Sequence, residues 1–388
     1  NFLLDFYPPD IVGFTDANFG INDRDVQLIE FLCDLKAKTG FPKRTFLFGP
    51  TKTKKHNLYK IEELLAEHGL IVDHKVSIQD FNPLVNINIK RTDAPWSEQL
   101  EAYKKIRDKY GQVVRLELML GLPGATLDSY YEALDVMGKD SVFSKRYYWL
   151  LLPTSPASNP EYMETHKIKT IKSRYGVRAS NGLTAILKIG ETENIESFTN
   201  SLLLNEKYTK PSDIVVETSS YTRDEWLEMY MMDQVIAILE IEKYTSYITK
   251  YLNDEHNIPY SLFYKRFWDK VLSSADFDGI QGEMIKEYID EGKAKLNETS
   301  DLPIDTFKNS IFGVYGRFEP MMNIAININR YTFYKRIYDF IVKEFGEIPG
   351  IYDLCMYSFN MIKFIDYEPN VTKFETEYNW DKYFKTKE

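Results

Sequence analysis

One acidic residue interrupts one of the most apolar segments of the sequence. Glu117 lies inside "RLELMLGLPGAT" (Arg115–Thr126), which predicts a buried strand that runs into a glycine–proline–glycine turn. A buried carboxylate is costly unless it is paired or hydrogen-bonded. Two roles are therefore open for Glu117: a structural ion pair with Arg91 or Arg115, or the acceptance of hydrogen bonds from the hydroxyl groups of a ligand.

The ends of the apolar segments differ in character from the segments themselves. They read "TDANFG", "FGPTKTKK", "SIQDFNP", "GLPGAT" and "LPTSP", and each is polar or rich in glycine. Ligands of parallel β/α folds bind at the carboxyl ends of the strands, so the pattern predicts one shared site along one rim. Gly121 and Gly124 would let a ligand approach the backbone closely, although an ordinary tight turn is the better explanation when the two glycines are considered alone.

The elements that must position these residues repeat one unit through the first part of the chain. Expected strands lie at 10–16, 43–49, 74–79, 113–120 and 146–152, and expected helices lie at 23–40, 57–69, 97–111 and 127–139. Alternating strands and helices are typical of parallel α/β architecture, and nearly continuous apolar strands fit burial on both faces. Five such units do not close an eight-stranded barrel. We therefore expect a partial barrel or a doubly wound sheet.

The rest of the chain has a different organisation. We divide the sequence into a β/α region (1–156), a polar crossover with two candidate strands (157–220) and a mainly helical C-terminal domain (221–388). Thr222 and Asp224 are good helix caps for the start of the last region. Its aromatic-rich tail is expected to pack back onto the body.

Composition excludes several classes of function. The 388-residue chain carries a net charge of −10, which disfavours nucleic acid as a partner. It has no run of about 18 apolar residues and no charged-then-apolar stretch after its first residue, so we expect neither a membrane span nor a signal peptide. The two cysteines, far apart in sequence, predict a reducing, cytoplasmic setting without disulfides. The five histidines show no zinc-binding spacing.

Several motifs resemble one enzyme superfamily. "SIQDFNPLVNINIKR", followed by "ELMLGLPGAT", is similar to the radical S-adenosylmethionine (radical SAM) superfamily. "FTDANFGINDRD" and "LLLPTSPASNPEY" resemble the subgroup that carries an upstream cobalamin-binding domain, and "IVVETSSYTRDEW" resembles the start of its C-terminal region. The similarity spans most of the first 230 residues.

The resemblance implies a fold and a cofactor set. The family fold is a partial (β/α)6 barrel, and this chain supplies five units, so the first unit is expected to lie outside it. That unit carries a C-x-x-x-C-x-x-C loop whose three thiolates hold a 4Fe–4S cluster beside S-adenosylmethionine. No such loop occurs here, so the cluster ligands are not in this chain. Cobalamin is the further cofactor that the subgroup implies.

The resemblance also implies residue roles around S-adenosylmethionine. Glu117 would bind the ribose hydroxyls, Arg91 would pair with the methionine carboxylate, and Gln79 would hold the same end. A strand-end group would meet the methionine amino group, and two further groups would flank the adenine. The group near the methionine amino group consists of Asp16, Asn18 and Phe19. One group beside the adenine consists of Gly121, Leu122, Pro123 and Gly124, and the other consists of Leu152 and Pro153.

Three functions follow from these observations. The first is the catalytic C-terminal portion of a cobalamin-dependent radical SAM enzyme. It would form a 5′-deoxyadenosyl radical for hydrogen abstraction and C-methylation of a small molecule or peptide, with a flavodoxin or ferredoxin as reductant. The alternative is a cluster-less, non-catalytic barrel that acts as a partner- or peptide-binding adapter. The third, a β/α lyase or aldolase with a phosphate-binding "KTKK" loop, is disfavoured because no clear Lys or His lies at a strand end.

Overall fold

The chain folds into two compact units. The computed structural model describes residues 10–16, 18–47, 56–70, 73–111, 113–144, 146–173, 187–188, 212–273, 277, 279–300, 306–309, 314–361 and 374–386. The first unit comprises Asn1–Leu118 and Asp140–Ser144, and the second comprises Met119–Lys139 and Lys145–Glu388. The sequence boundaries at 156 and 220 stay predictions.

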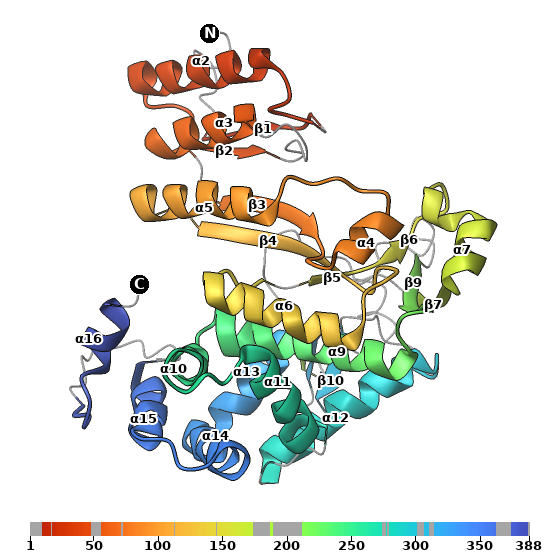
Figure 1. Cartoon of the computed structure of the whole chain (residues 1–388), viewed down its shortest axis with the longest axis vertical. Coiled ribbons are helices and arrows are strands. Elements are labelled where there is room, and N and C mark those ends of the chain that lie inside the picture. The colour runs from red at the N-terminus through yellow and green to blue at the C-terminus, as the bar shows by residue number, and fades with distance from the viewer. Residues whose placement is uncertain are drawn as a thin grey trace. The chain divides into compact units, whose positions relative to one another are not determined.

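The first unit alternates strands and helices as the sequence predicts. In order it contains β1 (Ile11–Phe14), α2 (Asp23–Thr39), β2 (Arg44–Leu47), α3 (His56–Glu67), β3 (Asp73–Gln79), α4 (Pro83–Asn88), α5 (Trp96–Tyr110) and most of β4 (Val113–Leu120) (Figure 1). β1 pairs in parallel with β2, and β3 pairs in parallel with β4. These two pairs belong to separate sheets, and the described strands do not close into a barrel. The chain is thus mixed α/β, and its described strands do not show the partial barrel that the resemblance implies.

Helix ends and apolar spacing explain the elements of this unit. Helices α2 and α5 stop at Gly40 and Gly111, which take the left-handed conformation at φ 76° and 64°. Apolar residues at helical spacing on α2 and α3 then meet in a core against Phe19. The core residues include Val26, Ile29, Leu32, Cys33, Ile61, Leu65, Ala66, Leu70 and Ile106. Cys33 is therefore a packing residue of this core.

The second unit begins at the end of β4 and is mainly helical. Its first part contains α6 (Leu127–Asp140), β5 (Arg146–Tyr148), β6 (Leu150–Leu151), a 3-10 turn (Pro156–Ser158), α7 (Pro160–His166), β7 (Lys169–Ser173), β8 (Leu187–Lys188) and β9 (Ser212–Glu217). β9 pairs antiparallel with both β6 and β7, so the sheet order is β6–β9–β7. The predicted crossover therefore contains a helix and an edge strand that the sequence analysis did not assign.

The predicted strand 146–152 is interrupted at Trp149. Its amide donates to the carbonyl of Leu120 at 3.2 Å, and its carbonyl accepts from Val215 at 3.1 Å. Because both backbone groups of Trp149 are engaged with different strands, the segment splits into β5 and β6.

The C-terminal part of the second unit is helical, as predicted. It contains α9 (Arg223–Ile236), a π-helical segment (Ala237–Ile241), α10 (Ser246–His256), α11 (Tyr260–Phe267), a second π-helical segment (Trp268–Leu272), α12 (Gly279–Leu296), β10 (Thr306–Asn309), β11 (Val314–Arg317), α13 (Phe318–Ile328), α14 (Arg330–Phe345), α15 (Ile351–Met361) and α16 (Trp380–Lys385). The cap at Thr222 is confirmed, since its hydroxyl accepts from the Glu225 amide. No helix in these described stretches combines the length and apolar character that a membrane crossing requires.

The aromatic tail packs back onto this unit, as expected from its composition. Helix α16 lies near α15 and α10 in Figure 1. The indole of Trp380 donates to Asp353 on α15 at 2.8 Å, and the hydroxyl of Tyr383 donates to Glu255 on α10 at 2.8 Å. Residues 362–373 of the tail lie outside the described residues.

Candidate functional site

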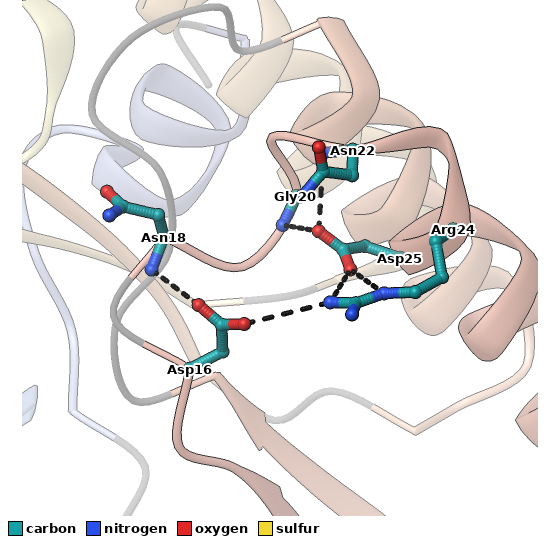
Figure 2. Close-up of polar contacts among 6 residues, drawn as sticks. All are labelled: Asp16, Asn18, Gly20, Asn22, Arg24 and Asp25. Atoms are coloured by element: carbon teal, nitrogen blue, oxygen red, sulfur yellow. Dashed lines mark hydrogen bonds and ion pairs between the residues drawn. The ribbon is translucent and has the colours of Figure 1, made fainter.

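The loop after β1 carries the first group of predicted site residues. Asp16 and Asn18 are exposed, and the Asp16 carboxylate accepts a hydrogen bond from the Asn18 amide at 2.9 Å (Figure 2). Phe19 is only 2% exposed, and its ring packs against Phe14 with centroids 4.5 Å apart. The Phe19 side chain thus belongs to the core, which leaves its backbone for any ligand at this loop.

A buried carboxylate on α2 holds this loop in place. Asp25 accepts hydrogen bonds from the amides of Gly20 at 3.0 Å and Asn22 at 3.3 Å, and from the Arg24 guanidinium at 2.9 Å (Figure 2). Burial alone would raise the pKa of Asp25, but these hydrogen bonds outweigh it and lower the pKa. Arg24 also lies 3.7 Å from Asp16, so one guanidinium links the buried acid to the exposed one.

β3 ends in an irregularity that places Gln79. The register with β4 pairs Ser77 with Glu117 and Gln79 with Leu118, so a residue is skipped at this point. Gln79 has φ 65°, a conformation that is uncommon for a residue with a side chain. Bulges of this kind redirect a side chain at the end of a strand, which is where a rim site requires it.

Arg91 is oriented by an acid that the sequence analysis missed. Its Nε lies 2.8 Å and 2.7 Å from the two carboxylate oxygens of Asp93. The Arg91 side chain is 20% exposed and that of Asp93 is 8% exposed. The Arg91 amide also donates to Asn86 on α4 at 2.9 Å, which fixes the backbone. The arginine–x–aspartate spacing was the sequence signal for this pair.

Glu117 lies on the more open face of β4. Its neighbours Leu116 and Leu118 are buried on the opposite face, at 2% and 1% exposed, whereas Glu117 is half-buried. The apolar sequence of this strand had suggested burial on both faces. The two faces are in fact buried to different extents. The Glu117 side chain therefore points to the partly exposed face of β4.

The Gly121–Gly124 turn lies in the second unit and is enclosed by protein. Gly121 and Gly124 have φ 82° and 95°, and all four turn residues are buried. A Cβ added at Gly121 would lie 2.8 Å from the hydroxyl oxygen of Tyr221 and 3.2 Å from the Trp226 ring. Packing against Tyr221 and Trp226 thus explains the missing side chain of Gly121, and this contact between distant residues was not part of the sequence prediction.

The segment after β6 places two predicted residues at the surface. Leu152 is 57% exposed and Pro153 is also exposed. The carbonyl of Leu152 accepts from the Ser155 amide at 3.0 Å, and that of Pro153 accepts from the Ser158 hydroxyl at 2.8 Å. A hydrogen-bonded turn therefore presents an exposed leucine. An exposed apolar side chain is what contact with a flat ring such as adenine would require.

The predicted site residues fall equally in the two units. Six lie in the first unit and six in the second, and Gln79 and Glu117 lie on paired strands. The polar members suit S-adenosylmethionine chemically, because a half-buried acid, an oriented guanidinium and an amide match its hydroxyl and carboxylate groups.

The cysteines do not fit an iron–sulfur cluster. Cys33 and Cys355 are both buried and lie in different units. Burial raises the pKa of Cys33 to about 11 and also raises the pKa of Cys355, so both favour the protonated thiol. Among the described residues, no group of three or more His, Cys, Asp or Glu side chains is arranged to hold a metal ion.

Comparison with known proteins shows a distant relationship to one class of enzymes. No family model matches the chain. It is 27% identical over 260 residues to 2-(S-pantetheinyl)-carbapenam-3-carboxylate methyltransferase of Streptantibioticus cattleyicolor, covering 65% of this chain and 34% of that protein. It is 25% identical over 268 residues to the cobalamin-dependent radical SAM methyltransferase TokK of Streptomyces tokunonensis, covering 67% of this chain and 35% of that protein. The chain is therefore distantly related to cobalamin-dependent radical SAM methyltransferases and spans about a third of the length of these relatives.

Two solved structures of one protein are also similar at low levels. Both are of the radical S-adenosylmethionine methyltransferase TsrM from Kitasatospora setae. The form with cobalamin and a [4Fe-4S] cluster matches with a TM-score of 0.38 and 13% identity, covering 75% of this chain and 52% of that chain. The form with tryptophan and a SAM analogue matches with a TM-score of 0.33 and 14% identity, covering 42% of this chain and 32% of that chain.

Proposed function

We propose that this chain is the S-adenosylmethionine-binding portion of a cobalamin-dependent radical SAM enzyme, with C-methylation as its reaction. The observation that carries the proposal is the relationship to two methyltransferases over about two thirds of the chain, one of them cobalamin-dependent. For the substrate we propose only a class, namely a small molecule or a peptide.

The geometry supports specific roles for the residues of the first unit. Glu117 would accept hydrogen bonds from the ribose hydroxyls, because it lies on the half-buried face of β4. Arg91, oriented by Asp93, would pair with the methionine carboxylate, and Gln79 would contact the same end. The exposed pair Asp16 and Asn18, with the backbone of Phe19, would receive the amino group.

The residues proposed for the base all belong to the second unit. The backbone of Gly121, Leu122, Pro123 and Gly124 would line one side of the adenine, with Leu152 and Pro153 as apolar contacts. When bound, S-adenosylmethionine would supply a 5′-deoxyadenosyl radical for hydrogen abstraction. The residues of this chain would bind and orient it and would exclude water from it.

The iron–sulfur cluster would be held by residues outside this chain. Its two buried cysteines do not provide three thiolates, and the relatives are about three times longer than the matched region. We further propose cobalamin as a second cofactor of the longer protein, a flavodoxin or ferredoxin as reductant, and a cytoplasmic location. We propose neither a nucleic acid nor a membrane as a partner.

One observation favours the second candidate, a non-catalytic adapter. The chain itself cannot supply the cluster thiolates. An adapter that kept the fold without the radical chemistry would therefore have the same features as this chain. Iron and cobalt contents, measured with the intact mass of protein purified anaerobically from its native source, separate the two. A mass well above 45.6 kDa with about four irons supports the enzyme, whereas a mass near 45.6 kDa without iron supports the adapter.

Binding measurements test the residue roles directly. Glu117→Gln and Arg91→Ala should each weaken S-adenosylmethionine binding about tenfold or more in calorimetry, because each removes a charge-assisted hydrogen bond. Glu132→Gln and Arg107→Ala are matched controls, since Glu132 is exposed on α6 and Arg107 pairs only with its neighbour Asp108 in the contacts described here. Unaltered affinity in both site variants would refute the assignment.

A further inference from the structure

The turn that follows β9 forms a compact hydrogen-bonded unit, which we name the clamp turn (Thr218–Tyr221). The Thr218 amide donates to the Tyr221 carbonyl at 3.1 Å, and the Ser220 amide donates to the Thr218 hydroxyl at 3.2 Å. The two hydroxyl groups of Thr218 and Ser220 lie 2.9 Å apart. Helix α9 starts immediately afterwards with a capping box between Thr222 and Glu225. The clamp turn is therefore fixed internally and anchored to a helix.

Two side chains of the clamp turn hold the Gly121–Gly124 turn at both ends. The Tyr221 hydroxyl donates to the Gly121 carbonyl at 2.6 Å, and the Gly124 amide donates to the Ser220 hydroxyl at 3.0 Å. Both glycines adopt positive φ, a region that glycine enters and leaves easily. Without these two hydrogen bonds the turn would sample other conformations.

An aromatic wall closes the same side of the turn. Trp226 on α9 is fully buried and stacks on Tyr230 with ring centroids 5.1 Å apart. Its ring lies 3.2 Å from the position that a Cβ on Gly121 would take. The Cβ side of Gly121 is thus filled by the indole and the Tyr221 hydroxyl. A ligand at this turn has to contact the backbone from another side.

We infer that Tyr221 and Ser220 are positioning residues that set the Gly121–Gly124 backbone for the nucleoside of S-adenosylmethionine. The inference rests on the function proposed above. The inference adds two residues that lie about 100 positions from the Gly121–Gly124 turn in the sequence. Neither residue belongs to the strand ends that define the predicted rim. Through them, the start of helix α9 is connected directly to the turn that would hold the base.

The Tyr221 phenol is suited to a permanent donor role. Burial raises the pKa of Tyr221 above its ordinary value, so the hydroxyl keeps its proton across the neutral range. The hydrogen bond to Gly121 is therefore not expected to change between about pH 6 and pH 9, which are both below the ordinary tyrosine pKa. A pH-independent effect distinguishes this role from that of a proton-transfer group.

The test compares Tyr221→Phe and Ser220→Ala with a matched control in the full 388-residue chain. The control is Tyr334→Phe, because Tyr334 is also fully buried in the second unit and donates to a backbone carbonyl, that of Tyr244, at 2.9 Å. Each variant is measured by thermal unfolding, by hydrogen exchange of the 121–124 amides and by calorimetric binding of S-adenosylhomocysteine. The last two report on the turn itself and on the nucleoside site.

The expected result separates positioning from general stability. Tyr221→Phe should speed exchange of the turn amides and weaken S-adenosylhomocysteine binding about three- to tenfold, equally at pH 6 and pH 9. Tyr334→Phe should lower the unfolding temperature about as much as Tyr221→Phe does. It should leave the exchange of the 121–124 amides and the binding of S-adenosylhomocysteine unchanged.

Two outcomes would overturn the inference. If the wild-type chain binds the probe and Tyr221→Phe binds it equally well, Tyr221 is not a positioning residue, although the proposed function survives. If the wild-type chain binds no S-adenosylhomocysteine at all, the proposed function fails, and the positioning role fails with it.

Discussion

The carboxylate of Asp25 shows how a residue without a predicted chemical role controls residues that have one. It is 1% exposed, and it accepts hydrogen bonds from the loop amides of Gly20 and Asn22 and from Arg24. Asp16 and Asn18 extend from that same loop. The exposed residues proposed to meet the ligand therefore depend on a buried acid for their placement.

Asp25→Asn should destabilise the first unit in a pH-dependent manner. Replacing the charged acceptor should lower the free energy of unfolding by about 1–3 kcal/mol at neutral pH. Because the pKa of Asp25 is lowered in the folded state, its contribution is complete above its ordinary value of 3.8 and is lost as the pH falls through the folded pKa. Urea unfolding at several pH values measures this difference. Asp34→Asn, an exposed acid on the same helix, is the control, and equal losses in both variants would contradict the prediction.

Glu240 presents the opposite electrostatic case in the second unit. Burial raises the pKa of Glu240 to about 7, although hydrogen bonds from the hydroxyls of Tyr264 and Thr249 act against the shift. The residue lies in the π-helical segment Ala237–Ile241, a geometry that is often found at functional positions. A carboxyl group that is half-protonated near neutral pH makes stability sensitive to pH.

Glu240→Gln should remove a pH dependence from the unfolding equilibrium. The folded state holds the proton more tightly than the unfolded state, so wild-type stability should fall as the pH rises from about 4.5 to about 7, by on the order of 3 kcal/mol. Glutamine keeps the shape and cannot titrate, so the variant should lack this slope. Thermal unfolding at pH 5 and pH 8 tests it, with Glu347→Gln at an exposed position as control. An unchanged slope in Glu240→Gln would show that another group is responsible.

Sequence patterns single out individual polar residues more readily than contacts between residues that are far apart in the chain. Glu117 stands out because it interrupts an apolar segment, and Gln79 stands out because it lies at the end of one. The partnership of Tyr221 with Gly121 could not be read from the sequence, because it joins residues 100 positions apart through tertiary packing. The packing role of Phe19 was also missed, because its ring meets Phe14 and the apolar residues of α2 and α3 only in the folded core.

At the scale of elements, local signals fixed most boundaries. The strand at 113–120 was predicted with the bounds that β4 has, and α2 ends at the predicted Gly40. β7 was missed because it is an edge strand whose exposed positions carry lysines, which make the segment look like a polar loop. An edge strand has one neighbour, so its sequence carries less apolar signal than that of a central strand such as β9.

The approach of α6 to α11 depends on a single glycine. A Cβ added to Gly138 on α6 would lie 2.4 Å from the ring of Tyr260, the first residue of α11. Alanine usually stabilises a helix relative to glycine by about 1 kcal/mol, because glycine loses more backbone entropy on folding. The steric conflict with the buried ring should reverse that sign.

Gly138→Ala should therefore lower the free energy of unfolding by about 1–3 kcal/mol, the range for overpacked cores. Gly292→Ala on α12 is the matched comparison, because its added Cβ would meet the flexible end of Leu227 at 2.9 Å and should cost much less. Urea unfolding of both variants measures the difference. If Gly138→Ala is neutral or stabilising, the two helices are not as close as the structure places them.

At the scale of the whole molecule, the chain does not finish one unit before it starts the next. It passes into the second unit after Leu118, returns to the first at Asp140 and leaves it again after Ser144. The second unit consequently uses residues on both sides of the predicted boundary at 156. Arg146, for example, is buried and lies 3.6 Å from Asp233 on α9, and Tyr131 on α6 donates to Glu228 at 2.7 Å.

A fragment that ends at residue 156 should accordingly fail to fold cooperatively, whereas a fragment of residues 113–388 should keep a cooperative transition. The shorter fragment loses Asp233 and leaves the buried charge of Arg146 unpaired, a defect that typically costs 3–5 kcal/mol. It also loses Tyr221, which holds the Gly121 carbonyl. The longer fragment keeps both contacts together with the sheet of β6, β9 and β7. Thermal unfolding followed by circular dichroism compares the two fragments. A sharp transition in the 1–156 fragment would mean that the β/α region folds without the helical part, and that the contacts of α6 and β5 with α9 form only after both regions are complete.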